Sequence, residues 1–124
     1  MSEMRENGVR DVASNLQMYG VLAKKSFTHN SNKWAKRFFV LKDGFLFYYA
    51  DSERKDFERH QVFNMHPKGV IPLGNCNIEP STEPGHPFSI IIRNDTFSMD
   101  VMLAAESDYT REKWLTLLKR SSLV

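Results

Sequence analysis

The amino-acid sequence predicts a mainly β protein: a seven-stranded, partly open antiparallel barrel capped by one C-terminal amphipathic α-helix. Three observations favour this class. From Met18 onward, apolar and polar residues alternate with a period of two, and turn signals separate the runs. After Ser107 the apolar pattern changes to a helical period. The length of 124 residues suits one core, and a strongly twisted sheet of this size tends to curl or close.

The alternating part of the chain divides into seven predicted strands. The tightest turns are expected at 42–44 and at 94–95, because Asp, Asn and Gly tolerate a positive φ or cap a turn. Pro72 cannot donate a ladder hydrogen bond, so its strand is expected at a sheet edge or its proline at a bulge. The predicted strands are 18–25, 33–41, 45–50, 69–73, 76–79, 88–93 and 96–104.

The C-terminal segment is predicted to form the capping helix. Ser107 can cap its first turn, and Asp108 suits the positive end of the helix dipole. The residues spaced at i, i+3 and i+4, which would pack into the open end of the barrel, are Trp114, Leu117 and Leu118.

The remaining composition points to one cytoplasmic domain. We expect residues 1–15 to form a flexible extension and residues 16–122 to form the domain. Cys76 stands alone, so no internal disulfide is expected. No apolar run approaches the roughly 18 residues of a membrane span, and the polar, acidic start is unlike a signal peptide. Contact with the cytoplasmic face of a membrane would therefore be peripheral and transient.

The charge of the chain is strongly polarised. The run 24–42 holds six of the seventeen Lys and Arg residues and no Asp or Glu, so it carries +6. The other residues hold eleven basic and fifteen acidic side chains, a net of −4. A basic face of this kind attracts anions such as phosphates or an acidic membrane leaflet.

Strand alternation predicts which of these side chains meet. Residues two apart share a face, so Lys24, Arg37 and Tyr48 should point to the same side as nearby apolar residues. Those apolar residues are Leu22, Phe39, Leu41 and Leu46. If they form the core, the three polar side chains converge at one rim. The opposite register, with Phe38 and Val40 inward, would turn Arg37 out to solvent.

Several segments then resemble one known family. The segments are 20–24 (GVLAK), 34–41 (WAKRFFVL), 46–49 (LFYY) and 67–73 (PKGVIPL), followed by the helix that carries Trp114. They resemble the first hairpin, the third and fourth strands and the capping helix of the pleckstrin homology (PH) domain. The resemblance covers about residues 18–122, and the stretch 45–76 is most similar to the family D type, whose members carry coiled-coil regions elsewhere.

This resemblance implies a headgroup pocket between the first two strands. By position, Lys24, Arg37, Tyr48 and Lys68 match residues that contact headgroup phosphates in the family. Ala35 occupies the place of a further basic residue in tightly binding members, so a modest, salt-sensitive affinity is expected. Further basic residues expected to face a membrane are Lys25, Lys33 and Lys36.

The expected function is therefore a non-enzymatic module that binds phosphoinositides or anionic phospholipids and recruits a larger protein to membranes. The alternative is a protein-interaction scaffold without lipid binding, with exposed Phe38, Val40, Phe45 and Tyr49 as its partner surface. Nucleic-acid binding is disfavoured by a net charge of only +2. No catalytic motif, cofactor signature or metal-ligand spacing of His and Cys76 is found in the sequence.

Overall fold

The computed structural model describes residues 16–27, 32–61 and 64–123. The predicted extension 1–15 lies outside this part of the chain. The elements, in chain order, are β1 (Leu16–Lys25), β2 (Trp34–Lys42), β3 (Phe45–Ala50), α2 (Glu53–His60), β4 (Gly69–Pro72), β5 (Asn77–Glu83), β6 (His86–Arg93), β7 (Val101–Ala104) and α3 (Asp108–Ser121).

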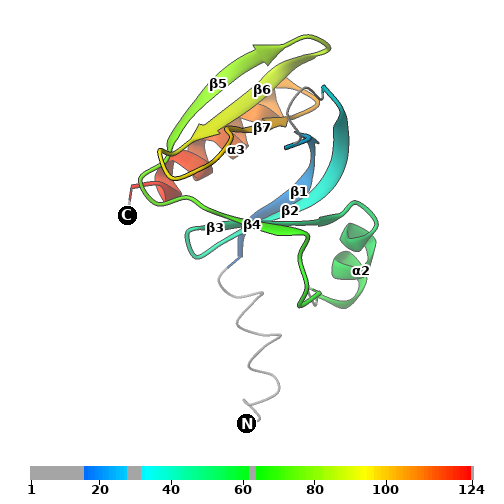
Figure 1. The fold of residues 1–124 in the computed structure, drawn as a ribbon. Helices are drawn as coiled ribbons and strands as arrows, with labels where there is room; N and C mark the ends of the chain where they lie inside the picture. Colours follow the sequence, from blue (N-terminus) through cyan, green and yellow to red (C-terminus); the bar gives the residue numbers. More distant parts are fainter. Residues whose placement is uncertain (1–15, 28–31, 62–63, 124) are drawn as a thin grey trace.

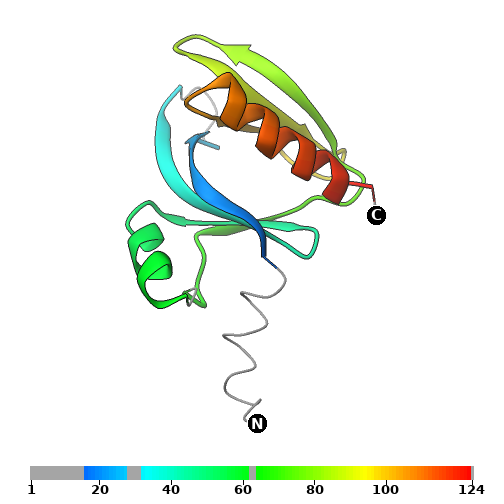
Figure 2. The same cartoon turned by 180° about the vertical axis from the view of Figure 1, so that it is seen from behind.

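The strands form one antiparallel sheet that bends into a half-barrel. Their order is β4-β3-β2-β1-β7-β6-β5, so β4 and β5 are its two edges (Figure 1). Seen from behind, α3 lies along the β5, β6 and β7 side of the sheet (Figure 2). The predicted fold class is confirmed. Pro72 belongs to the edge strand β4, where the loss of its N–H costs the sheet least, as expected.

The main core fills the concave side of the half-barrel. Leu22, Phe39, Leu41 and Leu46 all belong to it, as strand alternation predicts. Trp114 on α3 is 1% exposed, and its ring passes beside Gly20, where an added Cβ would lie 3.5 Å from it. The helix therefore closes the core, because its largest side chain is packed against the middle of β1.

The outer face of β2 and β3 is also buried, which the sequence interpretation missed. Phe38, Val40 and Tyr49 form a second cluster with Phe57, the one buried residue of α2. The prediction that Phe38, Val40 and Tyr49 are exposed is wrong, because α2 covers them. The opposite register is wrong as well, since Phe38 and Val40 lie outside the main core.

The turns agree with prediction in part. Asp43 and Gly44 both have positive φ, 52° and 82°, which suits the tight turn between β2 and β3. The Asn94 carbonyl accepts from the Phe97 N–H at 2.9 Å, so a turn follows β6 as expected. However, β7 begins only at Val101 instead of residue 96, so the second connection is a longer loop.

The β5 and β6 strands are longer than predicted. They continue to a turn at Pro84 and Gly85, where Glu83 pairs with His86 and Gly85 has a φ of 78°. Proline followed by a glycine of positive φ suits such a turn. Pro80 lies within β5, which is an edge strand and therefore tolerates the missing N–H.

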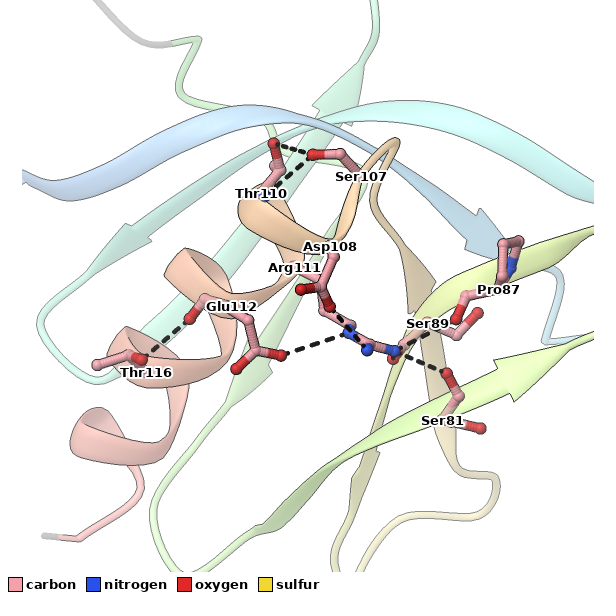
Figure 3. Close-up of polar contacts among 9 residues, drawn as sticks. All are labelled: Ser81, Pro87, Ser89, Ser107, Asp108, Thr110, Arg111, Glu112 and Thr116. Carbon is pink, nitrogen blue, oxygen red and sulfur yellow. Dashed lines mark hydrogen bonds and ion pairs between the residues drawn. The ribbon is translucent and has the colours of Figure 1, made fainter.

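One arginine ties α3 to this hairpin. Arg111 donates from one guanidinium nitrogen to the carbonyls of Ser81 at 3.1 Å and Pro87 at 3.3 Å (Figure 3). Its other terminal nitrogen pairs with Asp108 at 3.1 Å. Ser107, the residue before the first helical residue, caps α3. Its hydroxyl accepts from the Thr110 N–H at 3.1 Å. The cap and the arginine together set the start of α3 against the sheet.

Candidate anion-binding site

A cavity of about 410 Å³ opens at the end of the half-barrel where β1 and β2 meet their connecting loop. The structure brings Lys24, Arg37, Tyr48 and Lys68 together around this cavity. These are the four residues expected at the headgroup site. The other lining residues are Ser26, Phe27, Lys33, Trp34 and Ala35.

Strand pairing explains the convergence of the first three side chains. Lys24 pairs with Ala35, so it lies diagonally across from Arg37, two residues further along β2. Tyr48 on β3 pairs with Phe39, again two residues from Arg37. Since side chains two apart share a face, all three point to the concave side of the sheet. Lys68 is held beside them because its N–H donates to the Tyr48 carbonyl at 2.8 Å.

Lys24 is the most enclosed charge of the site. Its side chain is 9% exposed, and its ammonium lies 3.4 Å from the centre of the Phe27 ring and 5.2 Å from that of Tyr48. It donates to the Lys25 carbonyl at 3.2 Å. Burial, and secondly the positive charge of Arg37, lower the pKa of Lys24 to about 8. An anion in the cavity would reverse part of this effect by neutralising the repulsion.

Arg37 and Tyr48 complete the cationic wall with two kinds of donor. The Arg37 guanidinium donates to the Lys36 carbonyl at 3.0 Å, a bond that leaves further N–H groups on its planar fork. Burial raises the pKa of Tyr48, although the charge of Arg37 acts in the opposite direction. The phenol therefore stays protonated at neutral pH and can donate to an anionic oxygen.

The three further basic residues expected at the membrane side are not equivalent. Lys33 lines the cavity, whereas Lys25 and Lys36 do not. Lys36 points to the opposite face of β2 and lines a separate cavity of about 380 Å³ with His86 and Glu106. The structure thus separates Lys36 from Arg37, because adjacent strand residues face opposite sides.

The sequence interpretation did not assign Phe27, Trp34 or Ser26 to the site. Phe27 covers Lys24, and Trp34 lines the cavity while its ring stacks on His86 with centres 4.0 Å apart. Ser26 also lines the cavity. Their positions within the basic run 24–42 were the available signal, since residues that flank the tip of a hairpin share its end of the sheet.

The chemistry of the lining suits an anion and offers little to a cation. No Asp or Glu occurs among the described residues that line the cavity. Nor do the described ranges contain a group of three His, Cys, Asp or Glu side chains placed to hold a metal ion. Phosphate oxygens match these donors best, because ammonium and guanidinium groups form charge-assisted hydrogen bonds with them.

A comparison with family models assigns the chain to one class of protein. The model described as "PH domain" matches residues 16–123, so the chain belongs to the PH domain family. The chain is also 38% identical, over 110 residues, to "Pleckstrin homology domain-containing family D member 1" of Caenorhabditis elegans. The match covers 88% of this chain and 19% of that relative. The expected likeness to the family D type is confirmed.

Solved PH domain structures show the same architecture. The C-terminal PH domain of pleckstrin, in complex with D-myo-Ins(1,2,3,5,6)P5, is 20% identical with a TM-score of 0.68, and the match covers 86% of this chain and 95% of that one. The Slm1-PH domain in complex with phosphoserine is 17% identical with a TM-score of 0.68, covering 88% and 97%. At these identities the likeness concerns the fold alone. Within the described ranges, neither helix has the length and apolarity needed to cross a bilayer.

Proposed function

We propose that this domain is a non-enzymatic module that binds phosphoinositide headgroups at anionic membrane surfaces and recruits a larger protein there. One observation carries the proposal: Lys24, Arg37 and Lys68 surround one cavity with the phenol of Tyr48 and without an acidic side chain. The positive charges of these side chains repel one another, so bringing them together costs free energy unless an anion occupies the cavity.

The ligands named for structural relatives support the chemical class. An inositol phosphate was bound to the pleckstrin domain and phosphoserine to the Slm1 domain, and both ligands carry phosphate. Phosphate groups on an inositol ring would meet the cations on the β1, β2 and β4 sides of the cavity. The phenol of Tyr48 would donate from β3.

The affinity is expected to be modest. Each charge-assisted hydrogen bond contributes roughly 1.5 to 3 kcal/mol, so three or four such contacts support binding in the micromolar range. Ala35, directly opposite Lys24, contributes no such contact. Stable residence at a membrane would therefore need a second contact or a second copy of the domain.

The size of the relative supports a role in recruitment. The match spans 19% of the family D member, so the rest of that protein lies outside the domain. In a longer protein of this kind, the domain would supply the membrane contact, and other regions would supply the avidity that one site lacks.

Vesicle sedimentation tests the proposal. The double variant K24E/R37E is compared with wild type and with K113E/R120E, a matched charge reversal on α3. We expect wild type and the α3 variant to sediment with vesicles containing phosphatidylinositol bisphosphate, and the pocket variant to stay in solution. Equal sedimentation of all three proteins would overturn the pocket assignment.

Most of the surface expected for the protein-interaction alternative is not exposed. Of the four residues proposed for it, only Phe45 is exposed, at 43%, and Val70 on the neighbouring strand is exposed at 45%. These side chains belong to the outer face of β3 and β4, away from the cavity. A heteronuclear NMR titration with soluble inositol phosphates separates the two functions, because amide shifts within residues 24–37 are expected only for headgroup binding.

A further inference from the structure

We propose that Lys24 is a site of covalent acylation by small acyl phosphates, and that this modification switches off anion binding by the cavity. The modification itself depends only on the local geometry. Its regulatory consequence rests on the proposed headgroup function.

The amine of Lys24 lies at the edge of the cavity. Lys24 is one of the cavity-lining residues, so its amine borders the space a ligand would enter. Its described polar contact is the hydrogen bond to the Lys25 carbonyl, and no carboxylate of the described residues forms an ion pair with it. A neutral amine at this place would lose a cation–π contact with Phe27 but would leave no acid unpaired.

Other positively charged side chains surround that amine. Arg37, Lys68 and Lys33 line the same cavity and offer donors for a phosphate group. An acyl phosphate carries its electrophilic carbonyl one oxygen away from such a phosphate. When the phosphate is held by these cations, the carbonyl lies within the same cavity as the Lys24 amine. Holding two reactants together in this way raises their effective concentration.

The reaction balances without an additional reagent. The lone pair of the neutral Lys24 amine attacks the carbonyl carbon, and a C–N bond forms. The bond between that carbon and the phosphate oxygen breaks, so inorganic phosphate leaves with the electron pair. The amine loses one proton to solvent, and the product is a neutral amide.

The acid–base state of Lys24 supports this chemistry. Because only the neutral amine is nucleophilic, a pKa of about 8 leaves a substantial fraction reactive near neutral pH. An ordinary lysine, with a pKa of roughly 10.4, has about two hundredfold less neutral amine at pH 7.5. A less basic amine is also a weaker nucleophile, so the net preference is smaller than this ratio.

The consequence follows from charge and volume. Acylation removes one of the cavity's positive charges and places an acyl group in a cavity of about 410 Å³. An inositol phosphate would lose a charge-assisted contact and part of its space. The modified domain should therefore bind phosphate ligands at least about tenfold more weakly, the factor expected from one such contact.

Mass spectrometry after incubation with acetyl phosphate tests the site. Lys113 serves as the matched control, because its ammonium also lies over an aromatic ring, that of Tyr109 at 5.4 Å, but outside the cavity. We expect Lys24 to be acetylated at least about tenfold faster than Lys113, because only the Lys24 amine borders the cavity whose cations hold the phosphate. Excess inorganic phosphate should slow the reaction at Lys24 only. Equal rates at both lysines would overturn the proposal.

A neutral acyl donor separates phosphate capture from simple reactivity. With an N-hydroxysuccinimide ester, the preference for Lys24 over Lys113 should shrink, since no phosphate is held. An unchanged preference would show that the cavity does not capture the acyl phosphate and would overturn the proposed reaction.

Vesicle sedimentation in the same series tests the regulatory consequence. Acetylated wild type should lose sedimentation, and the loss should follow the acetylated fraction of Lys24 and not that of Lys113. If untreated wild type fails to sediment while Lys24 is still selectively acetylated, the headgroup function fails and the modification site stands. If acetylated wild type sediments normally, the proposed switch is wrong.

Discussion

Tyr48 on β3 occupies the space beside Gly69 on β4 that any larger residue would need. The two residues pair across the strands, and a Cβ built on Gly69 would overlap the phenol ring and its hydroxyl. The absence of a side chain on β4 is therefore what lets the phenol lie against the strand and border the cavity. A residue without a side chain thus positions one of the site's donors.

Replacing Gly69 with alanine should displace Tyr48 and weaken ligand binding. We expect the G69A variant to bind inositol phosphate about as poorly as Y48F, a several-fold loss, because both remove the phenolic donor from the cavity. Isothermal titration calorimetry measures both variants, and G74A in the turn after β4 serves as the control. Wild-type affinity in G69A would contradict the positioning role of the glycine.

Adding a basic residue at position 35 should strengthen binding. Ala35 lines the cavity and pairs with Lys24, so a longer cationic side chain there would reach the same space. The A35K variant should gain about tenfold in affinity, which corresponds to one charge-assisted hydrogen bond of roughly 1.5 kcal/mol. The neutral variant A35M tests whether length alone suffices. A gain in A35M equal to that in A35K would show that charge is not the cause.

The affinity for phosphate ligands should fall as pH rises above about 8. The pKa of Lys24 is lowered to about 8 in the free protein, and an anion binds the charged form better. Binding should therefore be nearly constant near pH 7 and weaken through pH 9, where ligand phosphates are fully ionised. The K24R variant keeps its charge and should lack this dependence. A calorimetric series from pH 7 to 9.5 that is flat for wild type would contradict the prediction.

Removing Phe57 should destabilise the domain by uncovering the second cluster. Phe57 is 1% exposed and packs against Phe38, with ring centres 6.0 Å apart. We expect F57A to lower the free energy of unfolding by about 3 to 5 kcal/mol, as for other buried phenylalanines. The control K55A lies on the exposed face of α2 and should change it by less than about 0.5 kcal/mol. Urea unfolding measures both, and equal midpoints would show that α2 is not bound to the sheet.

Replacing Arg111 should loosen the contact between α3 and the β5–β6 hairpin. The side chain of Arg111 is 16% exposed, and its guanidinium donates to the carbonyls of Ser81 and Pro87. R111M keeps the aliphatic length but removes these donors, so we expect a loss of about 2 to 3 kcal/mol in unfolding free energy. Thermal unfolding of R111M is compared with K113M. Hydrogen exchange at Ser81 and Ser89 should quicken only in R111M.

The local pattern of residues was enough to predict the sheet and the cationic face of the site. Period-two alternation placed Leu22, Phe39 and Leu46 in the core and Lys24 with Arg37 on the same side, because a strand permits only two orientations. The helix start at Ser107 was predictable for a similar reason, since a cap is a contact between residues three apart. These features depend on neighbours in the chain, which a sequence displays directly.

Other features depend on contacts between segments that are distant in sequence. The octapeptide of α2 is mostly charged, and Phe57 is its one buried residue, so nothing local distinguishes it from a solvated loop. Its docking is decided by the apolar outer face of β2 and β3. The positions of Phe27 over Lys24 and of Trp34 against His86 are likewise set by how the hairpin ends meet.

Short-range patterns were enough to predict the alternation of polar and apolar faces along each strand, the capping helix and the gathering of positive charge at one rim. The complete fold was needed to show that the outer face of β2 and β3 is covered and that Lys24 is enclosed enough to lower its pKa. The physical reason is the distance along the chain over which each interaction acts. Alternation and capping act over a few residues, whereas burial and electrostatic repulsion depend on the sum of neighbours brought by every strand.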